Sequence, residues 1–144
     1  MININFNSSI YIWFSIEYGF LYVGETNNKL GIIGRAYQHV MESGTLYYQV
    51  YERIGVDLYN INDLVLCNFP LPNERRYNSR ESIYRFAVEY LVQRILIEER
   101  KNIKFKFKVI SNVKSNDYVE NIEVQNIAKC IFEEFNRELN LNNV

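Results

Sequence analysis

The sequence predicts an α+β protein, and the first reason is a pair of strand-like segments joined by a tight turn. Residues 10–16 (IYIWFSI) and 20–24 (FLYVG) are rich in β-branched and aromatic residues, which is typical of the two arms of a β-hairpin. The short apolar run 63–69 (DLVLCNF) predicts a buried third strand. Segments with helical spacing lie between and after these strands, so the expected order is β-β-α-α-β-α followed by β-α.

Apolar residues at three- and four-residue spacing predict the helices. One helix is expected from Gly34 onward. Residues 45–55 (TLYYQVYERIG) are expected to form a second, shorter helix, although their Tyr and Val content leaves a strand possible. Asn78 and Glu81 have the spacing of an N-cap residue and its reciprocal carboxylate, the capping box. We therefore expect a long helix that begins near Asn78 and ends at about Arg100.

The last part of the chain predicts one strand and one helix. Residues 103–110 (IKFKFKVI) alternate between lysine and apolar side chains, as a half-buried strand does. The lysine face either follows phosphates or protects an edge strand from aggregation, and the second is the commoner reason. Residues 117–139 predict an amphipathic helix, which either packs on the domain or forms a dimer. Its apolar stripe consists of Ile122, Ile127, Cys130, Ile131, Phe135 and Leu139.

Length and composition indicate one globular domain. The chain has 144 residues, of which 48% are hydrophobic and 23% charged, so it is long enough to bury a core. No apolar run approaches the roughly 20 residues that span a bilayer, and the N-terminal residues lack the basic segment of a signal peptide. We therefore expect a cytoplasmic protein. Cys67 and Cys130 lie within apolar segments and are expected to be buried free thiols.

Charge is distributed unevenly along the chain. The formal net charge of −1 argues mildly against a protein that binds nucleic acid, since phosphate binding is largely electrostatic. Basic residues crowd the middle of the chain, however, at Arg75, Arg76, Arg80, Arg85, Arg94, Lys101, Lys104, Lys106 and Lys108. Acidic residues collect in the last third of the chain. The net charge by itself therefore does not decide whether the protein binds nucleic acid.

Two tyrosine-containing tripeptides occupy the predicted hairpin. They are Ser9-Ile10-Tyr11 and Tyr22-Val23-Gly24, with the two tyrosines eleven positions apart. The helix expected next carries Arg35 and, four residues later, His39, the only histidine of the chain. In this arrangement the chain resembles the GIY-YIG nuclease domain, whose hairpin carries two such tripeptides and whose next helix carries an arginine and often a histidine.

The resemblance extends over roughly residues 9 to 102. Glu89, within AVEYLVQRIL, stands where the family has its metal-binding glutamate, and Asn102 falls where members often have an asparagine after that helix. The family implies a small central antiparallel three-stranded sheet flanked by helices over residues 1–102. Residues 103–144 would then add a C-terminal strand and an amphipathic helix packed on the same domain.

The resemblance implies a metal-dependent DNA endonuclease that hydrolyses phosphodiester bonds with Mg²⁺ or Mn²⁺. In the family the glutamate, here Glu89, holds the metal ion that stabilises the leaving group. The arginine, here Arg35, contacts the scissile phosphate, for which a planar and permanently charged guanidinium is suited. Tyr11 would help to activate the water, His39 would take up its proton, and Tyr22 would position the phosphate or the water.

Among the candidate residues, the sequence pattern itself favours Glu89 most. It is the one charge in the run 86–92, and a carboxylate in apolar surroundings needs a compensating arginine or metal ion. Arg35 and His39 are four positions apart on the expected helix and therefore share a face. A strand tyrosine such as Tyr11 is usually a packing residue, and its place in the tripeptide is what singles it out.

The expected partner is DNA. The candidate DNA-contacting residues are Arg75, Arg76, Arg80, Asn102, Lys104 and Lys106. A homodimer is expected by analogy with standalone members of the family that pair to cut both strands. Two other classes stay open: a catalytically inactive nucleic-acid-binding or protein-interaction module on the same fold, and a small α+β accessory protein with chance matches to the motifs.

Overall fold

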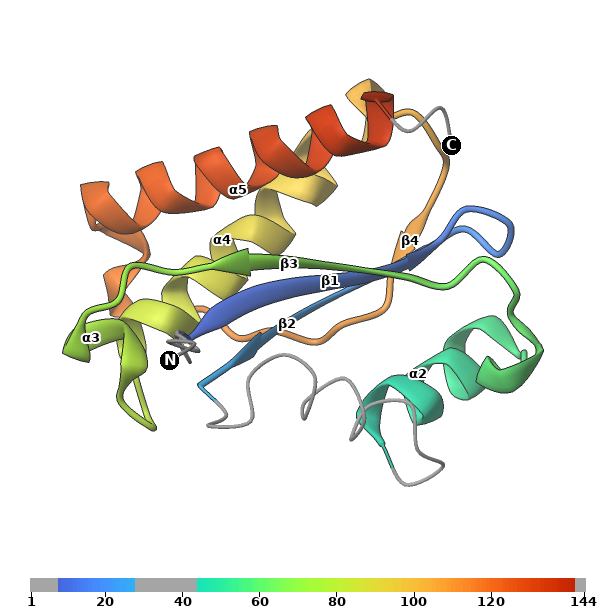
Figure 1. Ribbon diagram of the computed structural model, residues 1–144, viewed down its shortest axis with the longest axis horizontal. Coiled ribbons are helices and arrows are strands. Elements are labelled where there is room, and N and C mark those ends of the chain that lie inside the picture. The colour runs from blue at the N-terminus through green and yellow to red at the C-terminus, as the bar shows by residue number, and fades with distance from the viewer. Residues whose placement is uncertain (1–7, 28–43, 142–144) are drawn as a thin grey trace, which may run out of the picture.

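The computed structural model describes residues 8–27 and 44–141 and shows an open, mixed four-stranded sheet (Figure 1). In chain order the strands are β1 (Ser9–Ser15), β2 (Phe20–Thr26), β3 (Val65–Pro70) and β4 (Lys108–Val109). The helices within these residues are α2 (Thr45–Ile54), α3 (Arg75–Asn78), α4 (Ile83–Glu98) and α5 (Ile122–Leu141). Short 3-10 turns occupy Leu58–Asn60, Arg100–Asn102 and Asp117–Glu120. The predicted α+β class is confirmed.

The sheet has the strand order β3-β1-β2-β4. β1 pairs antiparallel with both β2 and β3, so three strands have the predicted antiparallel arrangement. β4 adds a fourth strand parallel to β2, with Phe20 opposite Lys108. The expected three-stranded sheet is therefore wrong by one strand. The parallel pair forms because α4 carries the chain from the β3 edge to the β2 edge, the long crossover that such a pair requires.

Both faces of the sheet are covered, which explains why β1 is a continuous apolar run. Ile10, Ile12 and Phe14 belong to a core with residues of α4 and α5, whereas Tyr11 and Trp13 belong to a second core with α2. Successive strand residues point to opposite faces, and every residue of β1 is buried. One core therefore lies on each face of the sheet.

The turn between β1 and β2 is held by Asp63. Gly19 adopts a φ of 64° in this turn, and its amide donates to the Ser15 carbonyl at 2.9 Å. The Asp63 carboxylate accepts hydrogen bonds from the Ser15 hydroxyl and from the Glu17 amide. Burial raises the pKa of Asp63, but the hydrogen bonds from Ser15 and the backbone outweigh it and hold the pKa below its ordinary value. The charged carboxylate thus ties the chain before β3 to the hairpin.

Helix α4 begins later than the sequence predicts. Ser82 is its N-cap, and the Ser82 hydroxyl accepts a hydrogen bond from the Arg85 amide at 3.0 Å. Asn78 instead ends α3, and its side chain accepts hydrogen bonds from the amide and the hydroxyl of Ser8. The predicted capping box of Asn78 and Glu81 is wrong, because the asparagine is used to hold the beginning of β1.

Two predicted strands differ in the structure. β3 is an edge strand in which Phe69 is the one buried residue, so the expectation of a buried strand is wrong. Within the predicted strand 103–110, only Lys108–Val109 is paired. The alternation is still present in the burial, since Ile103 and Phe107 are buried and the intervening lysines are exposed. The pattern predicted which side chains are buried, but not whether the backbone is paired.

The predicted amphipathic helix is α5, which begins after the 3-10 turn. Its buried stripe packs in the same core as α4 and consists of Val124, Ala128, Ile131, Phe135 and Leu139. Ile122 and Cys130 are exposed, although the sequence places them on the stripe. Cys67 is half-buried, so the expectation of free thiols is confirmed and the expectation of burial is wrong for Cys130. No helix in the described part of the chain is long and apolar enough to cross a membrane.

Candidate active site

The tyrosines of the two tripeptides lie on one face of the sheet. In the register of β1 and β2, Tyr11 is opposite Gly24 and Trp13 is opposite Tyr22. Tyr11, Trp13 and Tyr22, which we call the tyrosine face, pack in one cluster with α2, the short helix that the sequence predicts. Tyr11 is 1% exposed and Tyr22 is 8% exposed. The hairpin register thus brings together the two tyrosines that the family resemblance singles out.

Gly24 allows Tyr11 to lie where it does. A Cβ atom at position 24 would come within 2.1 Å of Cζ and 2.2 Å of the hydroxyl oxygen of Tyr11. Side chains do not pack that closely, so only glycine leaves room for the phenol. The last residue of the second tripeptide is therefore explained by the first tripeptide, because the phenol of Tyr11 occupies the space above Gly24.

Trp13 is a residue of this face that sequence reasoning missed. Its indole Nε1 is buried and has no hydrogen-bond partner within residues 8–27 and 44–141. A buried donor without a partner costs on the order of 1–3 kcal/mol. The signal that could have found Trp13 is strand alternation, since a residue two positions after Tyr11 must point to the same face.

Helix α4 is held against β2 at two points on the other face of the sheet. Arg85 forms an ion pair with Glu25 of β2, and its own side chain is 1% exposed. Two turns later, Gln93 accepts a hydrogen bond from the Ser111 hydroxyl, which itself accepts one from the Val23 amide at 3.0 Å. Side chains on one side of α4 are therefore linked to β2 at Glu25 and, through Ser111, at Val23.

Glu89 lies on this side of α4 between the two anchor points. Arg85, Glu89 and Gln93 are one helical turn apart, so they form one row along the helix. Glu89 is half-buried. Glu89 is therefore on the α4 side of the sheet, whereas Tyr11 packs on the opposite face with α2.

The guanidinium of Arg85 is directed at groups other than Glu89. Besides Glu25, it donates to the carbonyl oxygens of Tyr77 and Ser79, both at 2.6 Å, and of Arg80 at 2.8 Å. Arg85 is the second residue of the site that sequence reasoning missed. The signal that could have found it is its position, since Arg85 begins the apolar segment in which Glu89 stands.

Arg35 and His39, the two remaining candidates for catalysis, lie outside the described residues. So does the helix expected from Gly34 onward.

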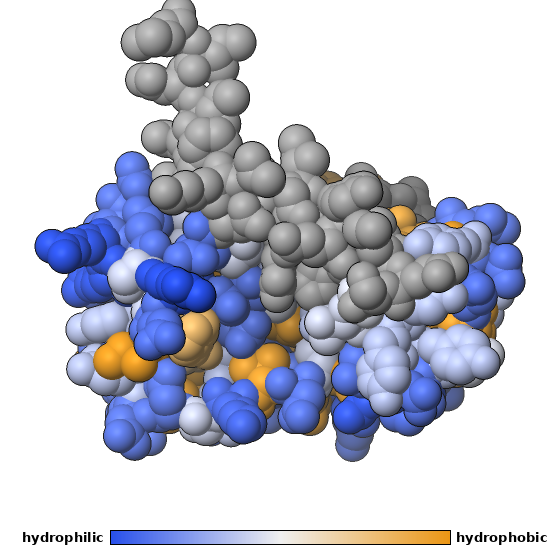
Figure 2. Space-filling view, turned by 90° about the horizontal axis from the view of Figure 1, so that it is seen from below, coloured by the Kyte–Doolittle hydropathy of each residue, from blue (hydrophilic) through white to orange (hydrophobic). Residues whose placement is uncertain are grey.

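The predicted DNA-contacting residues form two separate groups. Arg75, Arg76 and Arg80 are exposed before the N-terminus of α4, whereas Lys104 and Lys106 are exposed beyond its C-terminus. The 16 residues of α4 span about 24 Å. Figure 2 shows strongly hydrophilic side chains gathered at the α3 end and side chains of intermediate hydropathy over α2. The basic side chains therefore do not form one continuous surface.

Two of the predicted DNA-contacting residues have partners within the protein. The Arg76 guanidinium contacts the carboxylates of Glu74 at 2.6 Å and Glu123 at 2.7 Å. Asn102 donates to the Glu99 carboxylate at 2.7 Å, in the short turn that follows α4. A structural role at the end of the helix is thus enough to explain Asn102 without a contact to DNA.

The side chains that could act as metal ligands indicate how a metal ion would be held. Within residues 8–27 and 44–141, no three His, Cys, Asp or Glu side chains gather as a metal-binding group. Mg²⁺ typically keeps several waters and takes one or two carboxylates from a protein. The single carboxylate of Glu89 fits a site of this kind. The described residues do not form a cage of several protein ligands.

Comparisons of the chain with family models, with curated proteins and with solved structures gave no match. A functional assignment therefore rests on the geometry and chemistry of the residues described above.

Proposed function

We propose that the protein is a divalent-metal-dependent DNA endonuclease with a GIY-YIG-type site. The main support is the register of the hairpin, which places Tyr11 and Tyr22 on one face with the Tyr11 phenol above Gly24. The two tripeptides are therefore neighbours in space as well as motifs in the sequence. Glu89, in the row of α4 side chains between Arg85 and Gln93, adds the carboxylate that the chemistry needs.

The edge of β2 beyond Val23 is where we place the scissile phosphate. β4 pairs with β2 at Phe20 and Leu21, and Ser111 next to it accepts a hydrogen bond from the Val23 amide, so in the described part of the chain no strand is paired with this edge beyond Val23. In this proposal Glu89 would face the phosphate from the α4 side, and Tyr11 would face it from the tyrosine face. A phosphate there would lie between the carboxylate and the phenol.

Phosphodiester hydrolysis requires a deprotonated water, stabilisation of the charge that develops on the phosphate, and help for the leaving oxygen. A bound Mg²⁺ or Mn²⁺ would supply the last of these, and Glu89 would hold it. Tyr11 would orient the attacking water by a hydrogen bond, with His39 as the acceptor of its proton. Arg35 would bind the phosphate, and Tyr22 would fix the position of the phosphate or the water.

The test is nicking of supercoiled plasmid DNA by the purified protein. We expect nicking with Mg²⁺ or Mn²⁺, and none with EDTA. Glu89→Gln should lower the rate at least about 100-fold, because it removes the carboxylate that would hold the metal ion, and Tyr11→Phe should lower it by a similar factor, because the water loses the hydrogen bond that orients it. Glu98→Gln is the matched control for the carboxylate, since Glu98 is exposed at the far end of the same helix.

Three results would contradict the proposal. Equal nicking by the wild type and Glu89→Gln would remove Glu89 from the site. Equal loss of nicking in Glu98→Gln would show that the effect is not local. DNA binding without cleavage in any divalent metal would leave the inactive binding module as the function.

A further inference from the structure

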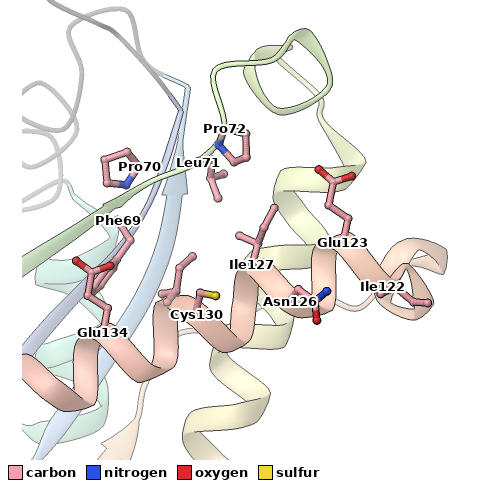
Figure 3. Close-up of a pocket in the computed structure, with 11 residues that line it drawn as sticks. Phe69, Pro70, Leu71, Pro72, Ile122, Glu123, Asn126, Ile127, Cys130 and Glu134 are labelled. Carbon is pink, nitrogen blue, oxygen red and sulfur yellow. The ribbon is translucent and has the colours of Figure 1, made fainter.

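A groove lies between β3 and α5, on the side of the molecule away from the tyrosine face. Its volume is about 720 Å³. One wall is the segment Phe69–Pro72 at the end of β3, and the other is the side of α5 from Ile122 to Glu134. Figure 3 shows Leu71 and Ile127 directed into the space between these walls. We call this feature the β3–α5 groove.

The groove runs beside an unpaired strand edge. β3 is the outermost strand and pairs, within the described residues, with β1 alone. The Leu71 amide donates to the Ser8 carbonyl at 2.9 Å, so alternate residues of β3 direct their backbone groups toward β1. Leu66 and Asn68 belong to the other set of alternate residues, which do not direct their backbone groups toward β1. Their N–H and C=O groups therefore point away from the sheet.

The groove combines an apolar interior with an acidic border. Phe69, Leu71, Ile127 and Ile131 supply apolar walls, and no lysine or arginine is among the lining residues. Two glutamates border it. Glu123 is paired with Arg76, whereas Glu134 is exposed and forms no ion pair with the described part of the chain. Such a surface repels the phosphates of a nucleic acid and attracts positively charged side chains.

A strand edge beside a helix and an apolar groove is the arrangement that binds extended peptides by strand addition. We propose that the β3–α5 groove binds an extended segment of a partner protein in which apolar residues alternate with lysine or arginine. The backbone of the segment pairs with Leu66 and Asn68 of β3. Its apolar side chains enter the groove, and a basic side chain contacts Glu134. This inference does not depend on the nuclease proposal, because the groove and the tyrosine face share no residue.

The test uses two short synthetic peptides, one in which Leu and Lys alternate and one in which Leu and Glu alternate. Titration of the full-length protein is followed by fluorescence anisotropy of the labelled peptide and by amide chemical shifts. We expect saturable binding of the Leu-Lys peptide, with shifts at Leu66, Asn68 and the groove side of α5, and no binding of the Leu-Glu peptide. Protection of the Cys130 thiol from alkylation gives an independent readout, since Cys130 lines the groove.

Variants separate a specific contact from general attraction between charges. Glu134→Lys should weaken binding of the Leu-Lys peptide about tenfold, by replacing attraction with repulsion. Glu133→Lys is the matched control, because Glu133 is exposed on the same helix but does not line the groove. Ile122→Ser should also weaken binding, and it leaves the core intact because Ile122 is 73% exposed.

The proposal is overturned if neither peptide binds, if both bind equally, or if Glu133→Lys weakens binding as much as Glu134→Lys. Shifts confined to α2 or to the tyrosine face would also overturn it. Sedimentation of the peptide-free protein tests self-association. A dimer that protects Cys130 would mean that a second copy of this chain, and not a partner peptide, occupies the groove.

Discussion

Arg85 and Glu25 form an ion pair in which the arginine side chain is 1% exposed and the glutamate side chain 21% exposed. The same guanidinium donates to three carbonyl oxygens around the end of α3. It therefore joins the end of α3 to β2, which carries Gly24, and to α4, which carries Glu89. We expect the geometry of the candidate site to depend on this one side chain.

Arg85→Met should lower the free energy of unfolding by about 3–5 kcal/mol, because it leaves a half-buried carboxylate and three carbonyls without a donor. Urea denaturation measures the change. Arg94→Met is the matched control, since Arg94 pairs with Glu98 on the exposed side of the same helix. It should change the free energy of unfolding much less, because an exposed ion pair contributes little to stability. Similar losses in the two variants would show that the enclosed pair has no special role.

Gly24→Ala should lower the free energy of unfolding by about 1–3 kcal/mol, because the new methyl group overlaps the Tyr11 ring. Tyr11→Leu removes the ring atoms that would clash. In the double variant the cost of the alanine should therefore shrink, with a coupling of about 1 kcal/mol or more between the two sites. Additive costs, measured by the same urea titrations, would contradict the close packing of Tyr11 on Gly24.

Ser82→Ala should cost about 1 kcal/mol, because the hydroxyl caps the first turn of α4. Glu81→Ala should change stability little, since Glu81 is exposed and is not part of the cap. Thermal unfolding of the two single variants distinguishes this structure from the capping box that the sequence predicts. A larger effect at Glu81 would restore that prediction.

Asp63 should make stability depend on pH at the acidic end. Its pKa is lowered in the folded state, so its contribution is fully present above the ordinary aspartate pKa of about 3.9 and is lost as the pH falls through the lowered value. The difference in unfolding free energy between the wild type and Asp63→Asn should be constant near neutrality and shrink in acid. A difference that grows as the pH falls would have the wrong sign.

The two cysteines should differ in reactivity. Burial raises the pKa of Cys67 to about 12, and the nearby charge of Glu138 adds to the effect, so its thiol stays protonated at about pH 8. Cys130 is exposed. A thiol reagent should therefore label Cys130 in the native protein and both cysteines after unfolding, with Cys130→Ser blocking the native reaction. Rapid labelling of Cys67 in that variant would contradict its burial.

The sequence was sufficient for elements whose pattern follows from local chemistry. The hairpin of β1 and β2 was predicted because aromatic and β-branched runs flank a short turn, and α5 was predicted because its apolar residues recur at helical spacing. For α2 a helix was expected, with a strand left possible by the Tyr and Val content of the segment. The tyrosine face follows from the same logic, since strand alternation and the hairpin register decide which residues share a face. Tyr11 and Tyr22 were accessible to sequence reasoning for this reason.

Other features depended on contacts between distant segments. Ser82 caps α4 in place of Asn78 because Asn78 is engaged with Ser8, seventy residues away in the chain. β3 is an edge strand, and only the end of the lysine-rich segment is paired, because pairing requires a free neighbouring edge and not only a suitable pattern. The DNA-contacting candidates were predicted from their charge, but their separation by α4 is a matter of tertiary arrangement.

The sequence by itself determined the α+β class, the hairpin and the residue types that favour a metal-dependent nuclease. Only the tertiary structure showed that the Tyr11 phenol requires glycine at position 24 and that Arg85 holds α4 to β2. The physical reason is that periodicity reports the burial of each side chain separately. Which buried or half-buried groups become neighbours is decided by packing between segments that the chain connects only through long loops and helices.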